Sequence, residues 1–211
     1  MGLVLQKLLT AVTTFVCFSF IPFLWWYIYH RKQVGFFEWV GFIKPKLKRS
    51  PWSLVVFLVV YYLFYTLDIK ALLDPESIDA MDSSSTVAAN AYKGLGAAAI
   101  LPCLIECFIA NGVSEELFYR GFLTKRLGAR LGMNTGIALQ AVCFGLMHNL
   151  LFLAGGTDVS AQMHLALFLV SGFGGLMLAL LNERIFNGSI IPSIFLHGLG
   201  NFISAISGAF S

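Results

Sequence analysis

Six long apolar blocks constrain the fold of this chain more than any other feature of its sequence. They cover residues 8–29, 52–69, 94–112, 135–153, 163–181 and 189–207. Each block is close to the ~20 residues with which a helix crosses a ~30 Å hydrocarbon layer. None of them alternates with a period of two, as the strands of a membrane barrel do. The pattern predicts an all-α, polytopic transmembrane helical bundle, with about six to seven helices around an intramembrane polar cavity.

The links between the blocks differ in charge. Residues 30–50 carry six basic side chains against Glu38, whereas residues 70–93 carry four acids between two lysines. Because cytoplasmic links are rich in Lys and Arg, we expect a multi-pass cell-membrane protein with the first link in the cytoplasm, and the second link and the N-terminus outside. The first block ends in an aromatic belt at residues 25–27 and lacks a cleavage pattern, which indicates a retained span. The net charge of +3 is explained by this topology and by contact with anionic lipids, without a nucleic-acid partner.

Two carboxylates and a guanidinium follow the third block. Ionisable groups at such a place are a functional-site hypothesis, because the bilayer disfavours them. Glu116 and Arg120, four residues apart, share a helical face and are expected to form an ion pair, while Glu115 points about 140° away from Arg120. Glu115 is therefore a candidate general base. The alternative is that all three form a salt-bridge cluster at the cytoplasmic rim.

A histidine in the fourth block lies about as far from Gly132 along the chain as Glu115 does. If the two helices form a hairpin about Gly132, Glu115 lies 17 residues before the turn and His148 lies 16 residues after it. At ~1.5 Å per residue, both are about 25 Å from the turn. The spacing predicts that Glu115 and His148 lie level with each other.

The last block adds two more polar groups, because His197 and Asn201 share one helical face. Their depths, counted from the basic side, are compatible with the depth of His148, so we expect one cavity near mid-membrane that opens toward the cytoplasm. His164, at the start of its block, matches none of these depths and is interpreted as interfacial.

Residues 94–131 would make a helix of ~57 Å, nearly twice the hydrocarbon thickness. Either this helix protrudes into the cytoplasm or it breaks at Asn111-Gly112. The break is attractive because Ser114 would then cap a new helix that carries both glutamates in its first turn. The sequence leaves both possibilities open.

Three motifs together resemble the CPBP or Abi family, which comprises type II CAAX prenyl endopeptidases and bacteriocin-processing enzymes. They are Glu115-Glu116-x-x-x-Arg120, Phe144-x-x-x-His148 and His197-x-x-x-Asn201, in the family's order. The resemblance covers roughly residues 111–207. We therefore divide the chain into an N-terminal two-span region, residues 1–93, and a family-like catalytic core, residues 94–211.

The resemblance implies an intramembrane protease with an assigned set of roles. Glu115, assisted by His148, would activate a water for attack on a peptide carbonyl. His197 and Asn201 would stabilise the oxyanion, with Glu116 and Arg120 supporting the site. The alternative within the enzyme class is a metalloprotease, in which Glu115, His148 and His197 would bind Zn²⁺ with an open water position. Against zinc, the chain has no His-Glu-x-x-His motif, so no cofactor is firmly implied.

The expected partners are the lipid bilayer and a membrane-associated protein or peptide. A CAAX-type C-terminus and a leader, bacteriocin or pheromone peptide fit equally well, and the small single-domain chain is typical of a prokaryotic source. A different class of function also stays open. The polar cluster could belong to a non-catalytic bacteriocin-immunity or regulatory membrane protein, for which Glu115 would be dispensable.

Overall fold

Helices form all six apolar blocks in the computed structural model, which describes residues 2–67, 69–84, 87, 89–154 and 160–211. The α-helices are α1 (Leu3–Tyr29), α2 (Phe36–Trp39), α3 (Pro51–Tyr65), α4 (Pro75–Ser83), α5 (Ile100–Leu104), α6 (Ser114–Glu116), α7 (Lys125–Leu131), α8 (Met133–Ala154), α9 (Ala161–Leu180) and α10 (Ile191–Ala209). Short 3₁₀ turns cover Ile69–Leu72 and Gly96–Ala99, and π-helical stretches cover Ile105–Val113, Leu117–Thr124 and Leu181–Ile185. Over the described ranges there is no β-strand, so the predicted all-α class is confirmed.

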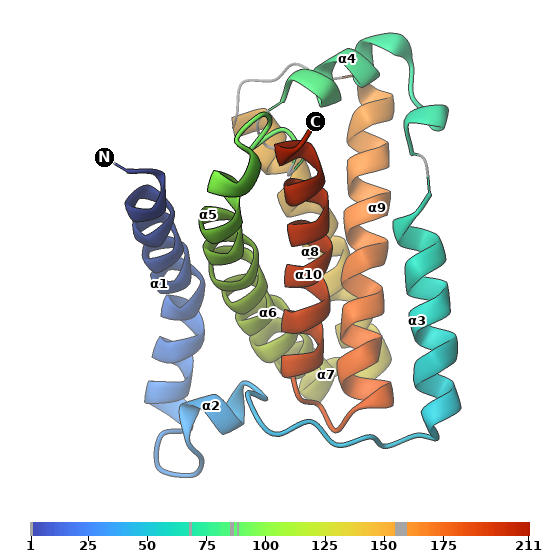
Figure 1. Ribbon diagram of the computed structural model, residues 1–211. Coiled ribbons are helices and arrows are strands. Elements are labelled where there is room, and N and C mark those ends of the chain that lie inside the picture. The colour runs from blue at the N-terminus through green and yellow to red at the C-terminus, as the bar shows by residue number, and fades with distance from the viewer. Residues whose placement is uncertain (1, 68, 85–86, 88, 155–159) are drawn as a thin grey trace.

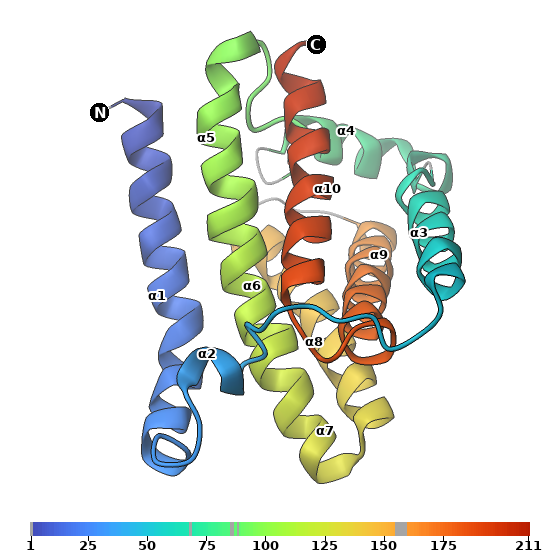
Figure 2. The same ribbon diagram turned by 60° about the horizontal axis from the view of Figure 1, so that its bottom comes forward.

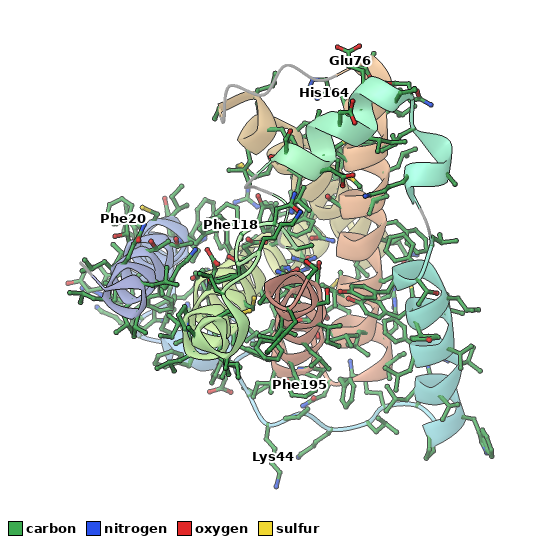
Figure 3. The ribbon with its side chains drawn as sticks, turned by 45° about the horizontal axis from the view of Figure 1, so that its top comes forward. Phe20, Lys44, Glu76, Phe118, His164 and Phe195 are labelled. Carbon is green, nitrogen blue, oxygen red and sulfur yellow. The ribbon has the colours of Figure 1, made fainter. Side chains whose placement is uncertain are left out.

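The structure is the helical membrane bundle that the sequence predicts (Figure 1). Among the described residues, four helical runs are long and apolar enough to cross a membrane: Leu3–Tyr29, Gly96–Leu131, Met133–Ala154 and Ala161–Ile185. The other two blocks form α3, with 15 residues, and α10, with 19 residues. Large apolar side chains point outward, including Phe20 (62% exposed) and Phe195 (60% exposed) (Figure 3). An apolar exterior of this kind fits lipid rather than water.

The third block forms one continuous helical run from Gly96 to Leu131, so of the two possibilities that the sequence left open, the break at Asn111-Gly112 does not occur. Val113 and Ser114 both have helical dihedral angles, and the Ser114 hydroxyl donates to the carbonyl of Ile109 instead of capping a new helix. The helix stays continuous, but its backbone departs from regular α-helical geometry in the π-helical stretches. Such stretches are frequent at functional sites.

A tight hairpin joins this long helix to α8, as the sequence predicts. Gly132 has a φ of +89°, a conformation that favours glycine, and it separates α7 from α8. The two helices then cross closely, because a Cβ on Gly136 would lie 2.5 Å from the backbone nitrogen of Gly128. The hairpin sets Glu115 and His148 at comparable distances from the turn.

One end of the bundle holds the links rich in Lys and Arg (Figure 2). The backbone N–H of Lys48 donates to Ile185 O at 2.8 Å, and that of Ile190 donates to Gly41 O at 2.9 Å. The Lys125 ammonium donates to Gly188 O at 2.7 Å. These bonds tie residues 30–50, helix α7 and the turn before α10 into one layer, which we call the basic end.

The opposite end, which we call the α4 end, holds both termini and helix α4 (Figures 1 and 2). The Asp74 carboxylate caps α4 by accepting from the Ser77 N–H, and this hydrogen bond holds the pKa of Asp74 below its ordinary value. Ser160 caps α9 and also donates to Asp74. Side chains of Lys44 and Glu76 mark the two ends in Figure 3.

Candidate active site

The predicted ion pair lies at the centre of the bundle. Arg120 Nη1 is 2.9 Å from Glu116 Oε1, and both side chains are at most 1% exposed. The guanidinium also stacks on the ring of Phe144, 4.3 Å from its centroid. This placement excludes the alternative of a salt-bridge cluster at the rim, because the pair is enclosed by protein on all sides.

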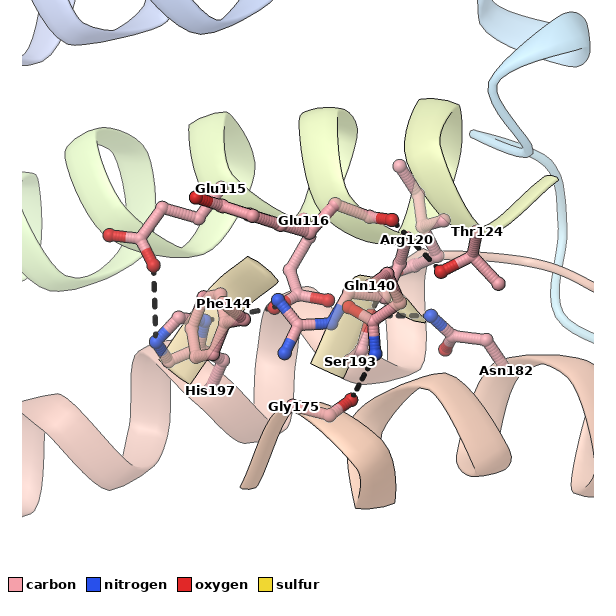
Figure 4. A network of polar contacts seen from close by, with 12 residues as sticks. Glu115, Glu116, Arg120, Thr124, Gln140, Phe144, Gly175, Asn182, Ser193 and His197 are labelled. Atoms are coloured by element: carbon pink, nitrogen blue, oxygen red, sulfur yellow. Dashed lines mark hydrogen bonds and ion pairs between the residues drawn. The ribbon is translucent and has the colours of Figure 1, made fainter. Parts of the chain in front are cut away.

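His197 of α10 lies between the two glutamates (Figure 4). Its Nδ1 is 2.9 Å from Glu116 Oε1, and its Nε2 is 3.9 Å from Glu115 Oε2. A carboxylate only accepts hydrogen bonds, so Nδ1 carries the proton that it donates to Glu116. The bond between Glu116 and His197 was missed by sequence reasoning, which gave Glu116 a single partner.

His148 of α8 is held by its own helix. Its Nδ1 lies 2.8 Å from the carbonyl oxygen of Phe144, one turn earlier. A carbonyl only accepts, so Nδ1 again carries the proton, and Nε2 keeps its lone pair in the neutral ring. The Phe144 ring is 4.5 Å from the His148 ring and 6.0 Å from the His197 ring, centroid to centroid. Phe144 is therefore the common apolar contact of both histidines and Arg120.

A cavity of about 430 Å³ brings the predicted residues together. Glu115, His148 and Asn201 line it from three different helices. His197 lies next to the cavity, with its Nε2 3.9 Å from Glu115 Oε2. Within the described part of the chain, Glu115 Oε2 is buried and accepts no hydrogen bond from a protein donor. This oxygen is free to accept one from a water or a substrate. By contrast, His164 is bonded to Asn149 beside the α4 end and lies outside the cavity lining (Figure 3).

The cavity has a second polar wall, formed by Glu106 and Asn111. In a regular α-helix Glu106 and Glu115, nine residues apart at 100° each, would lie on opposite faces. The π-helical stretch Ile105–Val113 takes more residues per turn and turns both carboxylates, with Asn111 between them, toward one side. Sequence reasoning missed this wall because it assumed regular helical periodicity. The sequence does contain a signal for this wall, because Glu106 is also an acidic residue within an apolar block.

Glu106 is itself held in place by two neighbours. It accepts from Lys7 of α1 at 2.5 Å and from the hydroxyl of Tyr92. Tyr92 is 1% exposed and belongs to the segment that joins α4 to the long helix. The carboxylate is thereby paired with a cation and stays fixed at the side of the cavity nearest the α4 end.

The cavity extends from Glu115 toward the α4 end of the bundle. Its lining reaches Ala91, Tyr92 and Phe152 at the α4 end. Toward the basic end, the space is filled by a buried polar layer (Figure 4). In this layer Gln140 donates to Gly175 O at 2.9 Å and Asn182 donates to Ser193 at 2.7 Å. The expected opening of this cavity toward the cytoplasm stays a prediction.

The donors for the alternative zinc site do not converge. Among the residues that the structure describes, no group of three His, Cys, Asp or Glu side chains is placed to hold a metal ion. Nδ1 of His197 is bonded to Glu116 and Nδ1 of His148 to Phe144 O, so only Nε2 of each ring could bind a metal ion, and the two rings form no three-ligand set with Glu115. As arranged, Glu115, His148 and His197 do not fit a zinc centre, so a mechanism for this site has to rely on its side chains and a water.

Residues 97–203 match the family described as type II CAAX prenyl endopeptidase Rce1-like. The match spans half of the chain and contains every residue of the three motifs, which confirms the resemblance inferred from them. Comparisons with curated proteins and with solved structures gave no match. The family consists of CAAX-type proteases that act on a protein or peptide in a membrane. The chain belongs to the type II CAAX prenyl endopeptidase Rce1-like family.

Proposed function

We propose that the protein is an intramembrane endopeptidase that uses a glutamate-activated water to cleave a membrane-associated protein or peptide. The observation that carries this proposal is the convergence of Glu115, His148 and Asn201 on one cavity, with His197 held between Glu115 and Glu116. A water is too weak a nucleophile without a base, and a peptide carbonyl needs donors for the negative charge that develops on its oxygen. The site contains a candidate base for the water and candidate hydrogen-bond donors for the carbonyl oxygen.

Glu115 is the base in this mechanism. Its Oε2, which accepts no hydrogen bond from a protein donor, takes a proton from the water. The lone pair of His148 Nε2 accepts a hydrogen bond from the other O–H of this water and orients the attack. The water oxygen bonds to the carbonyl carbon, and the carbonyl oxygen becomes an oxyanion. When the intermediate collapses, the C–N bond breaks and the leaving nitrogen takes the proton from Glu115. No atom beyond one water is consumed.

Asn201 and His197 stabilise the oxyanion. The Asn201 carboxamide donates directly, whereas His197 can donate from Nε2 only as an imidazolium, because its Nδ1 proton is committed to Glu116. The imidazolium is compatible with its surroundings, since Glu115, Glu116, Arg120 and His197 together then carry no net charge. Glu116 and Arg120 are thus positioning residues that hold His197.

The substrate is a peptide segment that the membrane brings to the cavity. The polar wall of Asn111 and Glu106 offers hydrogen-bond partners to the backbone of an extended peptide. A CAAX-type C-terminus, or a leader, bacteriocin or pheromone peptide, would satisfy this requirement, and a prokaryotic source suits the latter group. The wall contributes to binding rather than to the chemical step.

Glu115→Gln tests the proposal. Peptide termini are compared by mass spectrometry in membranes without the protein and in membranes that contain the wild type, Glu115→Gln, or the control Glu76→Gln, at an exposed residue of α4. We expect new termini with the wild type and the control, and none with Glu115→Gln, although all three proteins fold. New termini with Glu115→Gln would contradict the role of Glu115 as the base. If the termini in all three membranes matched those of membranes without the protein, the result would contradict the protease and favour a non-catalytic immunity or regulatory protein.

A further inference from the structure

Two glycines lie between the candidate oxyanion donors of α10. His197 and Asn201 share one face of this helix, and Gly198 and Gly200 stand between them in the chain. At 100° per residue, each glycine lies about 80° from the centre of the face that carries His197 and Asn201, one on either side. The groups that pack on these two glycines therefore set how α10 is rotated about its axis.

An aromatic ring packs on each of these glycines. A Cβ on Gly198 would lie 2.6 Å from Cδ1 of Phe108, a residue of the long helix. A Cβ on Gly200 would lie 3.2 Å from Cε2 of Tyr65, the last residue of α3. The absence of a side chain at both positions lets the rings approach the backbone closely. Helix α10 is thus held between two rings that come from two different helices.

Tyr65 also makes a polar contact with α10. Its hydroxyl donates a hydrogen bond to the carbonyl oxygen of Gly200, the residue directly before Asn201. A carbonyl oxygen inside a helix can accept this second bond, because it has two lone pairs. Phe108, on the other side, has only an apolar ring to offer. Tyr65 therefore fixes the direction of the α10 backbone as well as its packing.

Helix α3 is anchored on α9, beside which it lies at the edge of the bundle (Figures 1 and 2). Phe57 packs in a buried cluster with Met177, and the ring centroid of Phe64 is 4.6 Å from that of Phe173. Toward α10, both helices line a groove of about 210 Å³. Tyr65 contacts Gly200 across this groove from a helix whose position is set by α9.

The two candidate donors differ in what else holds them. His197 is bonded to Glu116 at 2.9 Å, so its ring has an anchor outside α10. In the part of the chain that the structure describes, no protein group forms a hydrogen bond with the Asn201 carboxamide. The direction of this carboxamide depends on the rotation of α10, and hence on the contact with Tyr65.

We propose that Tyr65 is a positioning residue of the candidate active site, which directs Asn201 toward the oxyanion by fixing the rotation of α10. Tyr65 lies outside residues 97–203, which match the family, so the N-terminal region of the chain contributes to the site. The proposal rests on the proposed function for the role of Asn201, whereas the link between Tyr65 and α10 is a property of the fold.

Tyr65→Phe tests the proposal, because it removes the hydroxyl and keeps the ring. The control is Tyr62→Phe, at a residue of the same helix and groove that is 65% exposed. The substrate is a synthetic peptide that covers a cleavage site found by the comparison of termini described above. A misplaced donor stabilises the oxyanion less but leaves the contacts of the bound peptide in place.

We expect kcat to fall about 10-fold or more in Tyr65→Phe, with KM within about 2-fold of the wild-type value. Tyr62→Phe should alter neither constant. An unchanged kcat in Tyr65→Phe would overturn the proposal, and so would equal falls in the two tyrosine variants.

A double-mutant cycle tests whether Tyr65 acts through Asn201. In the Asn201→Ala background no carboxamide is left to direct, so Tyr65→Phe should lower kcat by less than about 2-fold. A fall as large as the one in the wild-type background would show that Tyr65 acts elsewhere, and the proposal would be wrong.

Hydrogen exchange separates this proposal from the proposed function, because it needs no substrate. Exchange of the backbone amides of residues 198–204 is followed by mass spectrometry on the detergent-solubilised protein. Tyr65→Phe should speed up this exchange and Tyr62→Phe should not, since only the first loosens α10. Equal exchange in the wild type and Tyr65→Phe would overturn the link to α10, whatever the cleavage assay gives. If Glu115→Gln left every terminus unchanged, faster exchange in Tyr65→Phe would still confirm the link, and only the role in cleavage would be lost.

Discussion

His197 Nδ1 lies 2.9 Å from Glu116 Oε1, although 81 positions separate the two residues in the chain. The same carboxylate oxygen is 2.9 Å from Arg120 Nη1. Glu116 therefore links the helix that carries the candidate base to the helix that carries the candidate oxyanion donors. Because Glu116 and Arg120 are fully enclosed, neither charge can be solvated if the other is lost.

Glu116→Gln should lower both stability and cleavage. Glutamine still offers an oxygen to the His197 N–H, but it leaves the buried Arg120 guanidinium without a counter-charge. Removing one partner of a buried pair typically lowers the free energy of unfolding by about 3–5 kcal/mol. Unfolding of the detergent-solubilised protein, followed by circular dichroism, measures this loss.

Two further variants test whether the loss of stability in Glu116→Gln comes from the buried charge of Arg120. Asp82→Asn removes one partner of the Lys70 ion pair, whose side chains are 43% and 55% exposed, and should lower the free energy of unfolding by ~1 kcal/mol or less. Glu116→Gln with Arg120→Met removes both buried charges and should recover most of the stability but not the cleavage. If Glu116→Gln were no more destabilising than Asp82→Asn, the buried pair would not support the site in the way described.

Removal of metal ions should leave cleavage unchanged. Among the described residues, Glu115, His148 and His197 do not come together as a set of three metal ligands. The purified protein is stripped with a strong chelator, its metal content is checked by mass spectrometry, and cleavage is measured before and after addition of Zn²⁺. Activity that disappears on stripping and returns with Zn²⁺ would replace the glutamate mechanism by the metallo alternative.

The sequence predicted the parts of the structure that depend on local composition and regular helical geometry. Six apolar blocks gave six helices, the i, i+4 spacing gave the pair of Glu116 with Arg120, and equal distances from Gly132 placed Glu115 and His148 on one cavity. Each of these follows from hydropathy and a rise of ~1.5 Å per residue.

The features that the sequence did not predict have a different origin, because they concern how helices pack and where they depart from regularity. The π-helical stretch before Ser114 keeps the helix continuous and turns Glu106 onto the cavity wall. The position of the cavity between Glu115 and the α4 end depends on where the buried layer around Gln140 lies, and this is set by the packing of α8 against α9 and the long helix. Neither property is encoded in a period or a spacing along one helix.

Asn111→Ala should weaken substrate binding while leaving the chemical step intact. The Asn111 side chain lines the cavity one turn before Glu115. A hydrogen bond between neutral groups contributes about 0.5–1.5 kcal/mol, so we expect KM for the cleaved peptide to rise roughly 2- to 10-fold with kcat unchanged. Asn134→Ala, at a residue that accepts from Arg184 at the basic end, is the matched control and should alter neither constant. A fall in kcat for Asn111→Ala would place this side chain in the chemistry instead.

Gly145→Ala should disturb the site through the packing of α8 on α9. A Cβ on Gly145 would lie 2.6 Å from the backbone oxygen of Phe168, so the two helices must separate. Overpacking of this kind lowers the free energy of unfolding by about 1–3 kcal/mol, and cleavage should fall because His148 follows Gly145 by one turn on the same helix.

Gly174→Ala on α9 is the matched control, since its Cβ would meet only Phe64, at 3.9 Å. Alanine is favoured over glycine in a helix by up to about 1 kcal/mol, so Gly174→Ala should unfold at the same temperature as the wild type or a higher one. Equal losses in the two variants would show that the close contact at Gly145 does not hold α8 in place.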